Sequence, residues 1–155
     1  MLGGKPACVP VVTKNEKFCV LVLDDDICLT TIVTKALRNG LPNAEVLTAR
    51  SVAEAQLLLS EFKIHFFILD INLPDGNGID FLCDVRTLFP EARVMMITAS
   101  PDQDVVRQAM QLHVQGFILK PATNDAVLRA RTALGRFHTQ LAEDPHQVCK
   151  RLSCT

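Results

Sequence analysis

The chain has 155 residues, of which 48% are hydrophobic and 21% are charged, and its formal net charge is −1. This length and composition are typical of one globular domain with a substantial core. The near balance of charge gives no basic surface of the kind that binds nucleic acid or an anionic membrane, so neither is expected as a partner. The apolar runs are only of strand length, which argues against a membrane span.

The six cysteines are irregularly spaced, and none forms a C-x-x-C pair. This pattern gives no support to a disulfide framework or a zinc site. The four histidines are scattered without metal-like spacing and are expected at the surface or at sheet edges. We therefore expect a protein of the reducing cytoplasm.

The first half of the chain alternates strand patterns with helix patterns. Residues 18–23 form a continuous apolar run, typical of a strand buried on both faces, which ends at three consecutive aspartates. A helix pattern with apolar residues at spacings of three and four follows, and it includes Ile32. After a strand pattern over 44–48, Ser51 and Glu54 form a capping-box pattern that predicts the start of a second helix.

The second half continues the alternation. The apolar strand pattern over 66–70 ends on Asp70 and is followed directly by a turn rich in proline and glycine. The remaining elements are expected as a helix over 79–89, a strand over 93–98, a helix over 102–113 with Met110 on its apolar face, a strand over 116–119, and a helix over 124–141.

Five strands that alternate with five helices predict an α/β fold. Strands separated by helices need crossover connections, which give a mostly parallel, doubly wound sheet with helices on both faces. The domain is expected to occupy residues 18–141, with 1–17 as an N-terminal tail and 142–155 as a C-terminal tail or linker.

Polar side chains stand where the predicted strands end. In chain order these residues are Asp24, Asp25, Asp70, Thr98 and Lys120. Because the carboxyl ends of parallel strands share one edge of a sheet, we expect these side chains to lie together. Three adjacent carboxylates would repel one another and raise each other's pKa. A hard divalent cation such as Mg²⁺ would relieve that repulsion, so the sequence predicts a magnesium site.

The other two residues indicate what such a site would bind. Lys120 supplies a positive charge, and Thr98 supplies a hydroxyl donor, for an anion opposite the metal. This set of groups suits the positioning and neutralisation of a phosphoryl group, with one carboxylate as the nucleophile. Asp70 is the candidate nucleophile because the acid pair lies on one side of it and Thr98 and Lys120 lie on the other.

In these motifs the chain resembles the receiver domain of two-component response regulators, from about residue 18 to residue 141. The matching motifs are VLVLDDD with Asp24 and Asp25, ILDINLPDGNGID with Asp70, MMITAS with Thr98, and FILKP with Lys120. The resemblance implies a flavodoxin-like, five-stranded parallel sheet in the order 2-1-3-4-5.

The resemblance also implies a metal site and a role for each of its residues. Asp25, Asp70 and the backbone carbonyl of Asn72 would hold Mg²⁺, with Asp24 acting mostly through water. Asp70 would accept a phosphoryl group from a histidine kinase or a phosphotransfer protein. The protein would then be a conformational switch rather than a turnover enzyme, with slow self-dephosphorylation at most. Lys120 and Pro121 resemble a conserved cis X-Pro bond of the family.

The sequence departs from the family pattern near its end. The position of the switching aromatic residue is Phe117, which has no hydroxyl, and Ala122 stands where a second aromatic residue is common. Arg129 and Arg131 do not follow the basic pattern of winged-helix regulators, which dimerise through the fourth helix, the fifth strand and the fifth helix, so this mode of dimerisation is not expected. We expect Phe117 to respond to Thr98 on phosphorylation. A homodimer and an output domain beyond residue 155 stay open as partners.

Two other kinds of protein could use the same residues. Phosphatases of the haloacid-dehalogenase type also use a strand-end aspartate, Mg²⁺ and a lysine. They carry a second acid two residues after the nucleophile, whereas this chain has Asn72, which cannot transfer a proton. An unphosphorylated binding module with the same fold would have no need to bring three carboxylates together.

Overall fold

The computed structural model describes residues 17–99, 102–120 and 124–143. Its strands are β1 (Cys19–Leu23), β2 (Glu45–Ala49), β3 (Phe66–Asp70), β4 (Asn72–Leu73), β5 (Gly76–Asn77), β6 (Arg93–Thr98) and β7 (Gly116–Leu119). Its helices are α1 (Ile27–Gly40), α2 (Val52–Glu61), α3 (Gly78–Leu88), α4 (Gln103–Gln111) and α5 (Asn124–Glu143). The expected tails lie mostly outside the described residues.

The main sheet has five parallel strands in the order β2-β1-β3-β6-β7. This is the predicted order 2-1-3-4-5, because β4 and β5 form a separate two-stranded antiparallel hairpin. The hairpin was not predicted, since each of its strands has only two residues. It directly follows the strand that ends on Asp70.

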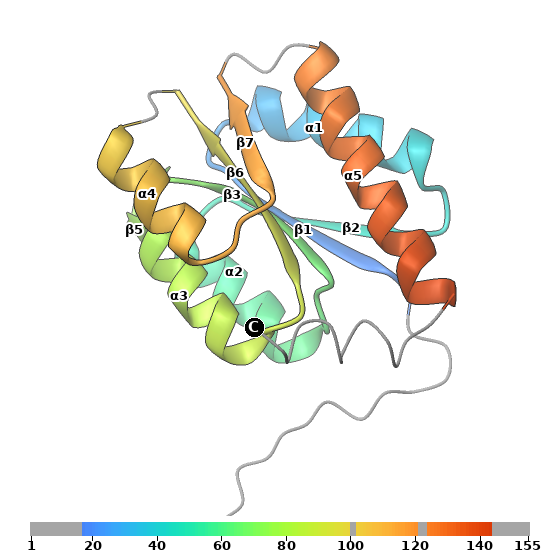
Figure 1. Cartoon of the computed structure of the whole chain (residues 1–155), viewed down its shortest axis with the longest axis horizontal. Coiled ribbons are helices and arrows are strands. Elements are labelled where there is room, and N and C mark those ends of the chain that lie inside the picture. Colours follow the sequence, from blue (N-terminus) through green and yellow to red (C-terminus); the bar gives the residue numbers. More distant parts are fainter. Residues whose placement is uncertain (1–16, 100–101, 121–123, 144–155) are drawn as a thin grey trace, which may run out of the picture.

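Helices cover both faces of the sheet, as Figure 1 shows, with α1 and α5 on one face and α2, α3 and α4 on the other. Alternate residues of each strand face opposite sides, so β1 contributes Leu21 to one core and Val22 to the other. All residues of β1 and β3 are buried. None of the helices in the described part of the chain is long and apolar enough to cross a membrane.

Side-chain caps fix the helix starts. Asp26 Oδ1 accepts a hydrogen bond from the N–H of Leu29 at 3.1 Å, and Ser51 Oγ accepts one from the N–H of Glu54 at 3.2 Å. The predicted start of α2 is therefore confirmed. In an ideal capping box, Glu54 would accept a hydrogen bond from the N–H of the cap residue Ser51. Here Glu54 Oε2 instead accepts from the N–H of Arg50, one residue earlier, at 2.9 Å.

Three expectations about single side chains were wrong. Ile32 and Met110 were placed on apolar helix faces, but their side chains are 52% and 55% exposed. His65 is half-buried rather than freely exposed: its Nδ1 accepts a hydrogen bond from the N–H of Cys19 at 3.1 Å, and its ring stacks on Phe18. Burial, helped by Lys63 and His138, lowers the pKa of His65 to about 4, so this ring is a neutral structural acceptor.

Gly78 lies where α3 begins, directly against the end of β3. Its N–H donates to the carbonyl of Ile71 at 2.7 Å. A Cβ at this position would collide with the backbone carbonyl of Asp70, which cannot move without shifting the strand end. The absence of a side chain at Gly78 therefore sets how closely α3 approaches the candidate nucleophile.

We predict that Gly78→Ala lowers the free energy of unfolding by roughly 1–3 kcal/mol, the range for overpacked sites. Gly135→Ala is the matched control, because no atom beyond its chain neighbours and the backbone of its own helix lies within 4 Å of a Cβ at that position in α5. The control should raise stability by roughly 0.5–1 kcal/mol, since alanine favours helix. Urea unfolding followed by circular dichroism measures both changes, and equal shifts in the two variants would contradict the close approach.

Candidate functional site

The carboxyl ends of the parallel strands bring the predicted site residues to one edge of the sheet. Asp24 follows β1, Asp70 ends β3, Thr98 ends β6 and Lys120 follows β7. The register places Asp70 opposite Ile97, one residue before Thr98. Lys120 lies beside the end of the neighbouring strand β6, because its N–H donates to the carbonyl of Thr98 at 2.9 Å.

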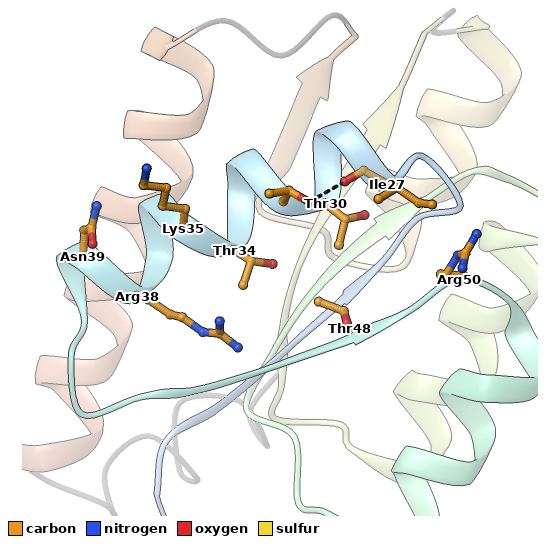
Figure 2. Close-up of a pocket in the computed structure, with 9 residues that line it drawn as sticks. Ile27, Thr30, Thr34, Lys35, Arg38, Asn39, Thr48 and Arg50 are labelled. Atoms are coloured by element: carbon orange, nitrogen blue, oxygen red, sulfur yellow. Dashed lines mark hydrogen bonds between the residues drawn. The ribbon is translucent and has the colours of Figure 1, made fainter.

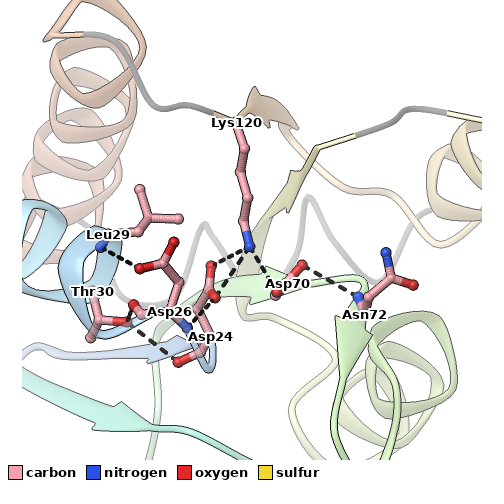
Figure 3. Close-up of polar contacts among 7 residues, drawn as sticks. All are labelled: Asp24, Asp26, Leu29, Thr30, Asp70, Asn72 and Lys120. Carbon is pink, nitrogen blue, oxygen red and sulfur yellow. Dashed lines mark hydrogen bonds and ion pairs between the residues drawn. The ribbon is translucent and has the colours of Figure 1, made fainter.

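Lys120 joins the first and third strands through its ammonium group. Figure 3 shows Nζ between the carboxylates of Asp24 and Asp70. It lies 2.9 Å from Asp70 Oδ2, and 3.2 Å and 3.1 Å from the two carboxylate oxygens of Asp24. Both carboxylates are buried, with Asp24 at 0% and Asp70 at 3% exposure, so the pairs lie in a low-dielectric environment.

Backbone N–H groups hold the same two carboxylates. Asp24 Oδ1 accepts from the N–H of Asp26 at 2.9 Å, and Asp70 Oδ1 accepts from the N–H of Asn72 at 3.3 Å. Asp26 also caps α1, so the helix start and the acid cluster share one turn of chain. Each carboxylate is thus oriented by the segment that directly follows it.

The charges in this site shift each other's proton affinities. Burial is the largest cause of the raised pKa of Asp24, which reaches about 6, and Asp70 adds to the rise while Asp26 and Lys120 oppose it. Burial alone would lower the pKa of Lys120, but its bonds to Asp70 and Asp24 outweigh this effect and raise it. Lys120 is therefore a firmly charged ammonium group.

The carboxylates fit a hard divalent cation. One oxygen from each of Asp24, Asp25 and Asp70 lies within 4.8 Å of the others, and Asp25 is exposed. Asp24 Oδ2 is buried and accepts no hydrogen bond within the described residues, although it forms an ion pair with Lys120, so it has remaining acceptor capacity for a second cation. An all-oxygen set that is open to water on one side suits Mg²⁺, which keeps several of its waters. Asn72 is exposed beside this cluster, and its carbonyl as a ligand stays a prediction.

The two predicted switch residues lie on neighbouring strands, and the register places Thr98 opposite Leu119, two residues after Phe117. Thr98 is buried at the end of β6, and Phe117 lies on the neighbouring strand β7 opposite Met96. Phe117 is half-buried and packs against the core on the side of α2, α3 and α4. Pro121 and Ala122, and with them the expected cis bond, lie outside the described residues.

The turn after Asp70 is tied to α2 by Asp75, which sequence reasoning missed. Asp75 Oδ1 accepts from the N–H of Val52 at 2.8 Å, and Oδ2 accepts from the N–H of Ala53 at 3.0 Å. These bonds are the largest causes of a lowered pKa of this exposed carboxyl group. Its negative charge also suits the positive end of a helix. The β4–β5 hairpin, which contains Asn72, is thereby anchored at a second point.

Comparisons with known proteins agree with this geometry. The family model described as "response regulator receiver domain" matches residues 20–132. Protein CcdB of Bacillus subtilis (strain 168) is 32% identical over 114 residues, which cover 72% of this chain and 92% of CcdB. Transcriptional regulatory protein DpiA of Escherichia coli (strain K12) is 28% identical over 129 residues, which cover 83% of this chain and 54% of DpiA.

Some relatives are much longer than this chain. The match to transcriptional regulatory protein CitT of Bacillus subtilis (strain 168) is 34% identical over 77 residues, and it spans 34% of CitT and 50% of this chain. The chain thus spans only about a third to a half of CitT and DpiA.

Solved structures show the same fold. A CheY-like response regulator receiver domain protein from Methanospirillum hungatei JF-1 superimposes with a TM-score of 0.70 at 20% identity, covering 81% of this chain and 99% of that one. The N-terminal domain of a Wolinella succinogenes protein gives a TM-score of 0.72 at 24% identity, covering 82% and 99%. With a family model that spans most of the described domain, the chain belongs to the response regulator receiver domain family.

Proposed function

We propose that this receiver domain is a Mg²⁺-dependent phosphoryl acceptor, with Asp70 as the residue that is phosphorylated. The observation that carries the proposal is the buried cluster in which Lys120 bridges Asp24 and Asp70 while three carboxylates offer oxygens within 4.8 Å. A structural ion pair would need one carboxylate for one ammonium group. The excess of negative charge supports a site for a cation and, beside it, an anion.

Asp70 is the best placed of the three acids to act as the nucleophile. It ends the central strand β3, and its two oxygens are held by Asn72 and Lys120. In the transfer, one Asp70 oxygen would form a bond to phosphorus while the bond to the donor's nitrogen or oxygen breaks. The electron pair of that bond leaves with the donor group. Lys120 would neutralise charge on the phosphoryl oxygens.

Magnesium would be held by Asp24, Asp25, Asp70 and the carbonyl of Asn72, and when bound it would neutralise charge between the acceptor and the phosphoryl group. The buried Asp24 carboxylate would be kept in its orientation by the N–H of Asp26. The exposed Asp25 would face the phosphoryl donor. A cytoplasmic histidine kinase or phosphotransfer protein would be the natural donor.

The domain is better suited to switching than to turnover. Asn72 stands two residues after Asp70, where a phosphatase of the haloacid-dehalogenase type needs an acid. With no proton-transferring side chain at that position, the acyl phosphate should hydrolyse slowly. Turnover of p-nitrophenyl phosphate tests this rival directly.

The output would depend on a change in conformation. Phosphorylation adds charge and strong acceptor oxygens at Asp70, and Thr98 at the neighbouring strand end would donate its hydroxyl to them. Movement of Thr98 would change the space beside β7, where Phe117 lies half-buried. Several relatives are named transcriptional regulators, so an output domain beyond residue 155 or a second copy would read this change.

The first prediction concerns the metal. Asp25→Ala should weaken Mg²⁺ binding by at least about tenfold, a loss typical even of residues that only support a ligand. Isothermal calorimetry measures this affinity, with Asp84→Ala as the control because Asp84 is an exposed acid on α3. Equal affinities in wild type and Asp25→Ala would remove Asp25 from the site.

The pH dependence of the same titration gives an internal check. The pKa of Asp24 is raised to about 6, so protons occupy this carboxylate below that pH and compete with the cation. The affinity for Mg²⁺ should therefore rise between about pH 5 and pH 7 and then level off. A flat profile would show that Asp24 stays ionised or takes no part.

The second prediction concerns the acceptor. With acetyl phosphate and Mg²⁺, wild type and Asp80→Asn should each gain the mass of one phosphoryl group, whereas Asp70→Asn should gain none. Asp80 is a suitable control because it is an exposed acid in the first turn of α3. Intact-mass spectrometry reads the result. A phosphoryl gain by Asp70→Asn would overturn the proposed function.

The third prediction concerns the coupling between Thr98 and Phe117. Thr98→Ala should still be phosphorylated, but beryllium fluoride should cause smaller chemical-shift changes around Phe117 than in wild type, because the differential contact is lost. Thr132→Ala is the control, since Thr132 is exposed and, among the described residues, its hydroxyl donates to the carbonyl of Leu128 one turn earlier in α5. Unchanged shifts in Thr98→Ala would refute the coupling and leave the acceptor assignment intact.

A further inference from the structure

A groove of about 500 Å³ lies between α1 and the edge strand β2 (Figure 2). Its volume lies within the range of ligand-binding sites. None of its lining residues belongs to the acid cluster. They are Ile27, Thr30, Thr31, Thr34, Lys35, Arg38, Asn39, Thr48 and Arg50.

The lining is cationic and rich in hydroxyl groups. It includes Lys35, Arg38 and Arg50 but no carboxylate, although the whole chain carries a net charge of −1. None of these three cations forms an ion pair with a described residue. Within the described part of the chain, the only hydrogen bond from the Arg38 guanidinium reaches the carbonyl of Val46 at 3.5 Å. Most of its donors are therefore available to an anionic ligand.

Thr34 provides an independent sign of a missing partner. The residue is 8% exposed, and its Oγ1 is buried without a hydrogen-bond partner among the described residues. Two other threonines of the groove, Thr30 and Thr31, instead donate to helix carbonyls, both at 2.8 Å. An unpaired buried hydroxyl costs free energy, so a polar group that entered the groove and bonded to Thr34 would recover it.

Among the described residues no strand pairs with the outer side of β2, where the only hydrogen bond to the backbone is the long one from Arg38 to the Val46 carbonyl. Glu45 donates to the carbonyl of Phe18, and the carbonyl of Ala49 accepts from Asp24, so the odd-numbered residues of β2 pair with β1. The backbone groups of Val46 and Thr48 therefore point away from β1, at the free edge of the sheet. Such an edge is the kind of surface to which an extended peptide adds as a further strand.

The spacing of the two arginines along β2 favours an extended peptide over a small anion as the ligand. Arg38 reaches the strand at Val46, and Arg50 lies four residues further along the same chain. At about 3.3 Å per residue this separation is roughly 13 Å, which matches side chains at positions i and i+4 on one face of a strand. An extended segment along β2 spans these two levels of the strand, a separation greater than the length of a small anion.

We propose that this groove binds an extended acidic segment of a partner protein, which pairs with the free edge of β2. Carboxylates spaced four residues apart would meet Arg38 and Arg50, and a polar group between them would bond to the hydroxyl of Thr34. The binding is independent of phosphoryl transfer, so Asp70→Asn should bind the segment as wild type does.

The test uses a fluorescein-labelled, end-blocked peptide of about seven residues that alternates glutamate with threonine, so that its acids share one face. Fluorescence anisotropy should show that the full chain binds it. The double variant Arg38→Gln/Arg50→Gln should bind roughly tenfold more weakly, the effect of losing two partly exposed charge pairs. The matched control is Arg107→Gln/Arg129→Gln, which removes two exposed arginines from α4 and α5 and should leave the affinity unchanged.

A second variant separates a lost contact from a lost fold. Thr34→Val removes the unpaired hydroxyl while it keeps the shape, so it should leave stability unchanged or higher and still weaken peptide binding. In wild type, the amide signals of Val46 and Thr48 should shift on addition of the peptide. The proposal is overturned if the peptide does not bind, if both arginine double variants lose affinity equally, or if citrate competes as strongly as the peptide does.

Discussion

The ammonium group of Lys120 between two buried carboxylates is the interaction on which the site depends. Removing charges from water costs several kcal/mol per ion unless they are paired and hydrogen-bonded. Asp24 and Asp70 are both buried, and each is paired with Lys120 and with a backbone N–H group. The ammonium group comes from the end of β7, and the acids come from the ends of β1 and β3. The ion pairs therefore connect the carboxyl ends of three strands.

The arrangement of the parallel strands positions these charged groups accurately. Parallel strands end together, so one buried sheet delivers residues that are nearly a hundred positions apart in the chain to contacts of about 3 Å. Gly78 lets α3 begin directly against the Asp70 carbonyl, and Asp75 holds the following hairpin on α2. The turn that follows Asp70 is therefore held in place by α3 and by α2, and this restricts the position of Asp70. A bound cation or phosphoryl group would meet carboxylates that are already oriented, which lowers the reorganisation needed for transfer.

The sequence was sufficient where the physical signal is local. The bounds of β6 and β7 follow directly from apolar runs, and the Ser51 cap of α2 needs only residues three positions apart. The contacts of Asp75 could not be predicted, because its partners lie more than twenty residues earlier and depend on how the hairpin folds. Ile32 shows another limit: helical spacing marks an apolar stripe, but the width of the neighbouring elements decides which of its members are covered. In contrast, the strand-end acids were predictable because sheet topology alone brings them together.

Although the net charge of the chain is near zero, two parts of its surface carry opposite local charge. The acid cluster sets three carboxylates against one ammonium group, whereas the groove beside β2 has three cations and no carboxylate. At physiological salt the Debye length is about 8 Å, so each field acts mainly on groups in direct contact with it. The composition argument against charged partners therefore applies to the molecule as a whole and not to each face. Excess negative charge at one end of the sheet favours a cation, beside which an anionic phosphoryl group would bind, whereas excess positive charge along one edge would favour the proposed acidic segment. If both partners bind as proposed, neither would compete for the other's charges, because the two sites share no lining residue.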